Sequence, residues 1–174
     1  MMSNSALPPD GVHVYEKEYE KEVIDLILSI QRTEFGIPVS IGDQPDLQTI
    51  PLFYQVNKGN FWIALRQGKV VGTIALLDIG KGRGALRKMF VDAAWRGKEY
   101  RVAQALLNTL LAWAIDRSYT EILLGTTEKF IAAHRFYEKN SFVEIPKNSL
   151  PPEFPVMAVD VKFYRLGTNN QGIL

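Results

Sequence analysis

The segment from Leu86 to Ile115 constrains the fold most strongly, because the spacing of its apolar residues changes within it. Residues 86–91 alternate as a β-strand does. After a short turn, the apolar residues recur at spacings of three and four, which is typical of one face of a helix. That face consists of Ala103, Leu106, Leu107, Leu110 and Ala114. A strand that leads into an amphipathic helix predicts a helix lying against a sheet.

The turn between this strand and helix lacks a residue that caps helices. From residue 96 to residue 103 there is no Ser, Thr, Asp or Asn to satisfy the first free N–H groups of the helix. The charged residues of the turn are Arg96, Lys98, Glu99 and Arg101. Because a helix start carries roughly half a positive charge, we expect a phosphate or pyrophosphate site here. The alternative is a turn whose cations are only solvated.

Composition excludes several classes of function. The 174 residues have a formal net charge of +1, which gives no reason to expect nucleic acid or an acidic membrane as a partner. The absence of cysteine excludes a disulfide framework, a thiolate metal site and a cysteine nucleophile, and we predict no metal site. No apolar run approaches the roughly 18 residues of a membrane span, so we expect a cytoplasmic protein.

The order of the expected elements predicts a single α/β (α+β) domain over residues 12–166, between flexible tails at 1–11 and 167–174. Expected strands cover residues 12–15, 61–65, 70–77, 86–91, 121–125, 142–145 and 156–164, with a flexible turn at 79–84. Expected helices cover 16–35, about 52–57, 102–115 and 128–139, the last capped by Thr126 or Thr127 and ended by a left-handed Asn140. We predict a mixed, mostly antiparallel sheet of six to seven strands flanked by helices. The strands on either side of the helix starting at Val102 form its parallel central pair, because right-handed crossovers join parallel strands.

Two passages resemble the GNAT superfamily of acyl-CoA-dependent N-acetyltransferases. Residues 89–98, MFVDAAWRGK, resemble the family's strand and the start of its pyrophosphate loop. Residues 132–142, AAHRFYEKNSF, resemble its late helix, with the pattern Ala-x-x-x-Tyr-Glu-Lys-x-Gly-Phe. The order of elements also fits over nearly the whole domain, and both motifs stand on the matching elements.

The family's loop, Gln/Arg-x-x-Gly-x-Gly/Ala, fits this sequence in two ways. One begins at Arg96 and has Glu99 where a glycine belongs. The other runs from Lys98 to Ala103 and has Arg101 in the glycine's place. We prefer the second, in which the guanidinium of Arg101 clamps a phosphate in place of close backbone approach. Two further departures are Ser141 for a glycine and Phe130 for an asparagine.

The resemblance implies that acetyl-CoA is the cosubstrate and lies between the splayed parallel strands. The residues it assigns to acetyl-CoA are Met89, Phe90, Val91, Arg96, Gly97, Lys98, Glu99, Tyr100, Arg101, Val102, Ala103 and Gln104. It makes Tyr137 the catalytic residue that assists departure of the CoA sulfur. The expected reaction is direct attack by a primary amine of a small molecule, peptide or protein in a ternary complex. The enzyme would be a monomer or a homodimer.

Several alternatives stay open in the sequence. Tyr137 also fits a core position, and His134 fits a surface or capping contact. The possible water-mediated bases are Glu34, Asp78, Glu99, Glu121 and Glu128, and sequence does not rank them. Phe53, Tyr54, Phe154 and Tyr164 fit either an acceptor pocket or the core. The alternative function is a non-catalytic CoA-binding or acyl-CoA-binding sensor or docking module.

Overall fold

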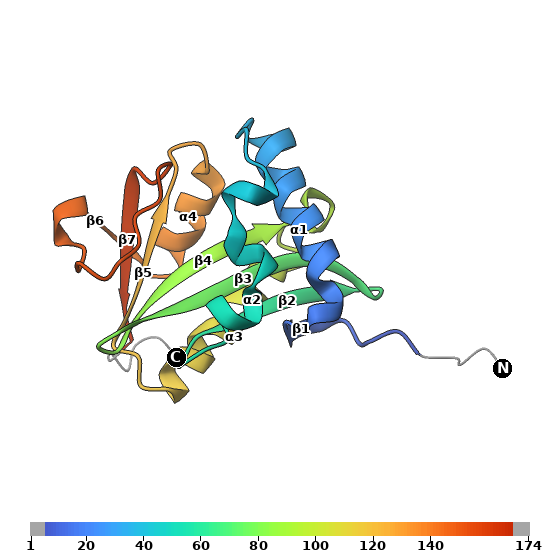
Figure 1. Cartoon of the computed structure of the whole chain (residues 1–174), viewed down its shortest axis with the longest axis horizontal. Coiled ribbons are helices and arrows are strands. Elements are labelled where there is room, and N and C mark those ends of the chain that lie inside the picture. The colour runs from blue at the N-terminus through green and yellow to red at the C-terminus, as the bar shows by residue number, and fades with distance from the viewer. Residues whose placement is uncertain (1–5, 169–174) are drawn as a thin grey trace.

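A seven-stranded sheet forms the centre of the protein, whose computed structural model describes residues 6–168 (Figure 1). The sheet has the order β1-β2-β3-β4-β5-β7-β6, and only the β4–β5 pair is parallel. The strands are β1 Gly11–Val14, β2 Asn60–Arg66, β3 Lys69–Gly80, β4 Arg83–Val91, β5 Glu121–Thr126, β6 Val143–Ile145 and β7 Lys162–Gly167. The predicted mixed fold with one parallel central pair is therefore confirmed.

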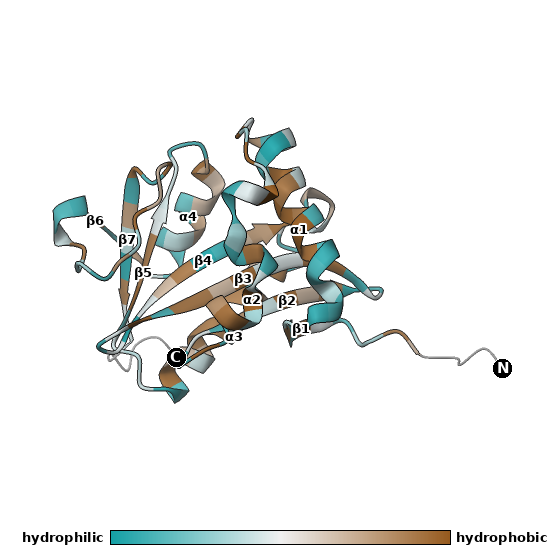
Figure 2. Ribbon diagram, in the orientation of Figure 1, coloured by the Kyte–Doolittle hydropathy of each residue, from teal (hydrophilic) through white to brown (hydrophobic). Residues whose placement is uncertain are grey.

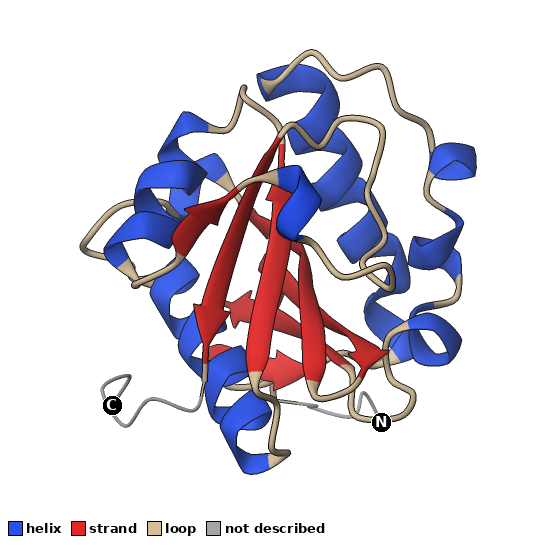
Figure 3. Ribbon diagram, turned by 90° about the vertical axis from the view of Figure 1, so that its left-hand side faces the viewer, coloured by secondary structure: helices blue, strands red, loops and turns tan. Residues whose placement is uncertain are grey.

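Helices cover both faces of the sheet (Figure 3), which explains why β2 is a continuous apolar run. Phe61 and Ile63 pack in one cluster with Val23 and Ile27 of α1 (Glu20–Ser29). Trp62 and Ala64 point the other way, into a cluster with α3 (Val102–Asp116). The hydropathy colouring shows apolar residues on the sheet and on the helices that cover it (Figure 2). Alternate residues of one strand thus fill two cores.

The first helical segment is divided, where a single helix over residues 16–35 was predicted. A 3₁₀ turn at Lys17–Tyr19 precedes α1, and a π-helical turn at Ile30–Glu34 follows it. In that π turn, the Thr33 hydroxyl donates to Ser29 O at 2.5 Å and so competes with the helical ladder.

The segment between α1 and β2 contains only short helical turns. They are two 3₁₀ turns, at Ile41–Asp43 and Pro45–Gln48, and α2 at Ile50–Phe53. The short helix therefore begins earlier than the predicted 52–57, because Pro51 suits the first turn of a helix.

The helix α3 begins at Val102 as predicted and lies close to the sheet. A Cβ atom at Gly72 of β3 would lie 2.9 Å from Leu106 Cδ1 and 3.2 Å from Phe90 O. Only a glycine lets the helix approach β3 this closely without displacement. The position of α3 therefore depends on the sheet as well as on its own periodicity.

The last helix ends at Lys139 as predicted, but its predicted start, its cap and the conformation of Asn140 are wrong. The helix α4 spans Ile131–Lys139 and has no side-chain cap, because the Thr127 hydroxyl instead accepts the N–H of Lys129 in a preceding turn. Asn140 is not left-handed, at φ −96°, and its side-chain amide donates to Phe136 O. Ser141 takes the left-handed conformation, at φ 71°, in the position where the family pattern has glycine.

Two loops also differ from prediction. The β3–β4 connection is a tight turn at Lys81 and Gly82, both with positive φ, where a flexible turn over 79–84 was expected. Residues 156–161 form a loop with a 3₁₀ turn at 147–149 before it, so β7 begins at Lys162. The first strand begins at Gly11 and the last strand ends at Gly167, inside the two expected tails, while residues 1–5 and 169–174 lie outside the described residues.

Candidate active site

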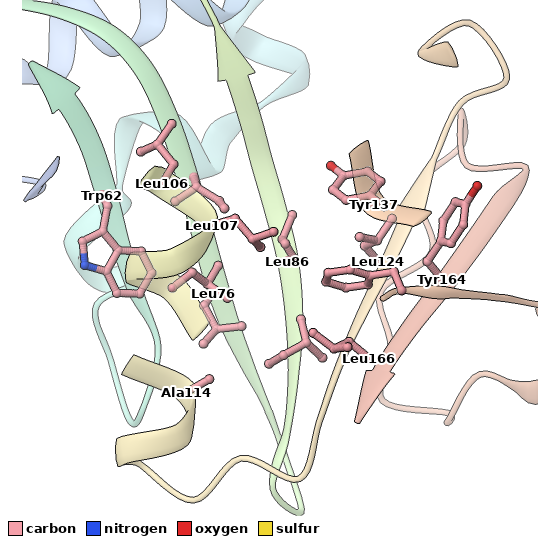
Figure 4. Close-up of a cluster of buried hydrophobic side chains, with 14 of the residues drawn as sticks. Trp62, Leu76, Leu86, Leu106, Leu107, Ala114, Leu124, Tyr137, Tyr164 and Leu166 are labelled. Atoms are coloured by element: carbon pink, nitrogen blue, oxygen red, sulfur yellow. The ribbon is translucent and has the colours of Figure 1, made fainter. Parts of the chain in front are cut away.

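The two parallel strands separate beyond a short paired region. Residues Arg83–Ala85 of β4 pair with Glu121–Leu123 of β5, and the pairing stops there. Beyond it, β4 continues beside β3 to Val91 and β5 continues beside β7 to Thr126. Figure 4 shows the strands diverging past Leu86 and Leu124. Within the described part of the chain, the main-chain groups that face this opening have no strand partner.

A bulge in β4 lies at the opening. The register with β3 shifts between Thr73 and Ala75, opposite residues 87–90. Lys88 has φ 53°, and the buried Thr73 hydroxyl donates to Lys88 O at 2.6 Å. A bulge bends its strand and increases the twist, so it turns the end of β4 away from β5.

A cavity of about 490 Å³ occupies the opening between β4 and β5. Its walls include Met89 and Phe90 of β4, the end of β5 from Leu124 to Thr126, and Tyr137 of α4. The other walls come from residues 37–44 and from the loop at 154–160. This volume is in the range of small-molecule sites.

Tyr137 reaches the cavity from the α3 and α4 side of the sheet. Its ring is 6% exposed and lies 5.6 Å from the Phe142 ring and 6.0 Å from the Tyr164 ring. The hydroxyl points toward β4 in Figure 4 and has no hydrogen-bond partner among residues 6–168. Burial raises the pKa of Tyr137 above its ordinary value near 10. At neutral pH this hydroxyl is therefore a hydrogen-bond donor and not a base.

Two residues beside Tyr137 have structural contacts. His134 is buried, and its Nε2 lies 2.8 Å from Thr127 O, which fits the capping contact predicted from sequence. The Phe130 ring lies 4.2 Å from the Phe35 ring and 6.4 Å from the Phe90 ring. Phe130 thus joins α4 to the end of the first helical segment at the mouth of the cavity.

A second cavity, of about 620 Å³, lies at the start of α3. It brings together most of the loop residues predicted from sequence, and its lining consists of Val91, Trp95, Arg96, Gly97, Lys98, Arg101, Val102, Ala103, Gln104, Phe136 and Lys139. Glu99 and Tyr100 do not line it, and Tyr100 packs its ring 5.2 Å from Trp95 instead. Lys139, at the end of α4, is a cation that the sequence reading did not place here.

Arg96 is not a free cation at this cavity. Its Nη1 and Nη2 donate to the two carboxylate oxygens of Glu34 at 2.6 and 2.9 Å, and its Nε donates to Val91 O at 2.8 Å. Arg96 was predicted from sequence to bind an anion, but Glu34 already balances its positive charge. Lys98, Arg101 and Lys139 are the cations left to face an anion in this cavity.

The start of α3 is uncapped, as the sequence predicted. No side chain caps it, and among the described residues the N–H groups of Val102, Ala103 and Gln104 have no acceptor. Arg101 precedes the helix at φ 53°, the left-handed conformation that glycine adopts most readily. This conformation agrees with the layout of the loop that puts Arg101 in the glycine's place. The Gln104 side chain donates to Asn140 Oδ1 at 2.9 Å and joins α3 to the end of α4.

A buried polar cluster borders the first cavity on the α1 and α2 side. Lys88 Nζ lies 2.6 Å from Gln44 Oε1 and 3.4 Å from Asp46 Oδ2, and the Tyr54 hydroxyl donates to Asp46 at 2.5 Å. Burial lowers the pKa of Lys88, although Asp46 opposes this shift. Tyr54 is therefore a core residue, as Tyr164 is, whereas Phe154 lines the cavity.

None of the five carboxylates considered as bases lines the first cavity. Glu34 and Glu121 are paired with arginines, and Asp78 accepts the N–H of Lys58. Two carboxylates not considered from sequence do line it, Asp43, which accepts from the N–H and hydroxyl of Ser40, and Asp160. Across residues 6–168 no three His, Cys, Asp or Glu side chains cluster in a way that would hold a metal, and none of the helices there is both long and apolar enough to span a membrane.

The curated relatives include proteins named N-acetylaspartate synthetase and proteins named N-acetyltransferase. N-acetylaspartate synthetase of Xenopus tropicalis is 34% identical over 125 residues, which cover 70% of this chain and 45% of that protein. N-acetyltransferase 8B of Homo sapiens is 32% identical over 110 residues, which cover 60% of this chain and 48% of that protein. The chain spans about half the length of the curated relatives it matches.

Solved structures resemble the whole described fold. An acetyltransferase of the GNAT family from Staphylococcus aureus Mu50 aligns with a TM-score of 0.88 and 37% identity, covering 92% of this chain and 99% of that one. PaiA N-acetyltransferase from Thermoplasma acidophilum, solved with coenzyme A, aligns with a TM-score of 0.67 at 14% identity, a likeness of fold alone. A family model described as "Acetyltransferase (GNAT) family" matches residues 24–142. The chain therefore belongs to the GNAT family of acetyltransferases.

Proposed function

We propose that this protein transfers the acetyl group of acetyl-CoA to a primary amine. The observation that carries the proposal is the opening between β4 and β5, which exposes strand edges beside a buried tyrosine and near an uncapped helix start. The residues fit the cosubstrate, because the N–H groups that lack acceptors and the nearby cations match a diphosphate. The opening between strands matches an extended chain that carries amide groups.

In the proposed complex, the diphosphate binds at the start of α3. The N–H groups of Val102, Ala103 and Gln104 donate to phosphate oxygens, and Lys98 and Arg101 supply positive charge. Gly97, at φ 111°, shapes the preceding turn. Arg96 acts indirectly, by fixing the end of β4 to Glu34.

The amides of the pantetheine arm pair with the main chain of Met89, Phe90 and Val91 as an added strand would, except at Val91 O, which accepts from Arg96 Nε. This pairing brings the thioester to the cavity, close to Tyr137. Glu99 and Tyr100 do not line the second cavity, and we assign them no contact with CoA.

The amine nitrogen attacks the thioester carbonyl, the C–N bond forms, and the C–S bond breaks. The Tyr137 hydroxyl donates a hydrogen bond to the leaving sulfur. Because burial raises the pKa of Tyr137, complete proton transfer to a thiolate, whose conjugate acid has a pKa near 8.5, is more unfavourable than for an ordinary tyrosine. The residue therefore stabilises the developing negative charge by donation.

The proposal is tested by release of free CoA thiol from acetyl-CoA in the presence of a panel of primary amines. We expect Tyr137→Phe to lower kcat by about 100-fold while the Kd for CoA stays unchanged. Tyr119→Phe is the matched control, because it removes a buried hydroxyl of the same core that does not line the cavity. Unchanged kcat in Tyr137→Phe would remove the catalytic role.

The same assay distinguishes acetyl transfer from the alternative function. Arg101 in place of a glycine and the Arg96–Glu34 pair both alter the loop, which favours a non-catalytic CoA-binding sensor as the second candidate. That candidate predicts CoA binding without thiol release for every amine of the panel.

A further inference from the structure

Arg87 is a cation in the wall of the first cavity, and it forms no direct ion pair with a described residue. Within residues 6–168, no acidic oxygen lies within 4.0 Å of its guanidinium. The guanidinium carbon lies 5.7 Å from the centre of the Phe53 ring and 5.8 Å from that of the Tyr54 ring. Its Nη2 faces Met157 Sδ at 3.6 Å, which is a weak acceptor. An arginine held against aromatic rings keeps its planar set of donors for a carboxylate or phosphate.

Asp160 is a carboxylate in the same cavity, and it forms no direct ion pair with a described residue. Its Oδ2 accepts the N–H of Met157 at 2.9 Å, and no Lys or Arg of the described chain forms an ion pair with it. It lies against Gly125 of β5, where a Cβ atom would be 2.6 Å from Oδ2. Burial raises the pKa of Asp160, and Arg87 opposes this shift. The glycine therefore makes room for a carboxylate that the cavity desolvates.

The two charges share one side of the sheet, opposite Tyr137. Gly125 of β5 meets Phe163, which packs with Ala85 of β4, and Arg87 follows Ala85 by two residues on the same face. Tyr137 packs in the other cluster, with Leu86 and Leu124. An acceptor that contacts Arg87 and Asp160 would thus meet the thioester from the side opposite Tyr137.

We propose that the acceptor is a small amine that also carries a carboxylate, such as a free amino acid. Arg87 binds the carboxylate, and Asp160 binds the ammonium group and takes its proton. This inference rests on the proposed acetyl transfer and names its substrate class. Arg87 and Asp160 line one cavity of about 490 Å³ without a direct ion pair, and their charges are opposite to those of the carboxylate and ammonium groups of a zwitterion.

Both protons that the ammonium group loses in this reaction have an acceptor, Asp160 for the first and the CoA sulfur for the second. The ammonium gives its first proton to Asp160, which passes it to solvent after the reaction. The neutral nitrogen then attacks the thioester carbon, and the C–N bond forms. As the C–S bond breaks, the second proton of the nitrogen ends on the CoA sulfur, so the products are the N-acetylated amino acid and CoA thiol.

The first test compares acceptors that differ only in the carboxylate. Thiol release is measured with the free amino acids, their methyl esters and the corresponding decarboxylated amines. We expect at least one amino acid to exceed its ester and its decarboxylated amine by about 100-fold in kcat/KM, the loss expected when a charged hydrogen-bond pair is removed. The inference would be overturned if the acceptors with the highest kcat/KM lacked a carboxylate.

The second test removes the cation. Arg87→Met should raise KM for the preferred amino acid about 100-fold, and Arg87→Lys should restore part of this loss. The decarboxylated amine should react equally well with Arg87→Met and wild type. Arg135→Met removes an exposed arginine of α4 outside the cavity and is the matched control. Equal losses for both acceptors would mean that Arg87 only supports the fold.

The third test removes the base. Asp160→Asn keeps an oxygen that accepts the N–H of Met157, so it preserves the turn. We expect it to lower kcat about 100-fold at pH 7. The loss should shrink as pH approaches the pKa of the amine, because the acceptor then arrives unprotonated. A loss that does not change with pH would contradict a role as base.

These outcomes separate the inference from the proposed function. If no amine and no amino acid releases thiol, acetyl transfer itself fails. If amines without a carboxylate react as well as their matched amino acids, acetyl transfer stands and only the assignment of Arg87 and Asp160 is wrong.

Discussion

At the scale of single residues, burial controls what each titratable group does. Lys88 and Tyr137 both border the first cavity, and burial favours the neutral form of each. Asp160 follows the same rule, because its pKa is raised. The cavity thus holds a tyrosine suited to donate and a carboxylate suited to accept a proton. Their opposite roles follow from one physical cause.

The raised pKa of Tyr137 gives a prediction for the pH dependence of kcat. The hydroxyl acts while protonated, and a raised pKa keeps it protonated up to and beyond pH 10. We therefore expect kcat to show no alkaline decline below pH 10 that depends on Tyr137. Profiles of kcat against pH for wild type and Tyr137→Phe measure this. A decline in wild type with a midpoint below 10, absent from the variant, would contradict the protonated donor.

Residue identity alone predicted part of this site. Tyr137 was identified from the motif that surrounds it, and the start of α3 was identified from the missing cap. Each of these patterns lies within a few consecutive residues. Arg87 and Asp160 were missed, since their meaning depends on contacts with residues about 70 and 35 positions away along the chain. In the sequence, Arg87 follows Leu86 within an expected strand, and this position indicates only that one face of the strand is partly exposed.

At the scale of elements, the bulge in β4 separates the parallel strands. Its backbone conformation at Lys88 is held by the Thr73 hydroxyl, which comes from the neighbouring strand. Because Thr73 is fully buried, water does not replace a lost donor there. The conformation of the bulge therefore depends on this side-chain hydrogen bond as well as on the strand pairing.

We expect Thr73→Val to lower the free energy of unfolding by about 1–3 kcal/mol, the range for leaving a buried carbonyl without its donor. Urea denaturation measures the loss. Thr73→Ser keeps the hydroxyl, so it should retain more thiol-release activity than Thr73→Val. Wild-type stability and activity in Thr73→Val would show that the bulge does not need this bond.

Elements with long periodic patterns were predicted well, and elements that end at local turns were not. The periodicity of α3 is continuous over its length, so its start was correct. Residues 156–161 contain three valines, at positions 156, 159 and 161, and β-branched residues are typical of a strand, yet the segment forms a loop along the cavity. The Asp160–Met157 turn holds this loop, and residue composition alone does not reveal it.

At the scale of the whole molecule, the protein joins two halves of a sheet at a short parallel contact. The crossover through α3 made the parallel direction predictable. The length of the contact was not predictable, because it depends on the bulge and on the partners β3 and β7. Local patterns also do not predict pairs such as Arg96 and Glu34, which lie 62 residues apart along the chain.

The proposed acetyl transfer requires CoA to bind at the start of α3 and along the opening between β4 and β5. The most direct measurement is a calorimetric titration of the full chain with CoA, for wild type and for Arg101→Asn. Asparagine tolerates the left-handed conformation of residue 101 but carries no charge. We predict one site per chain, with binding about 10-fold weaker in Arg101→Asn. No detectable binding of CoA to wild type, or equal affinity in the two proteins, would contradict the proposed diphosphate site.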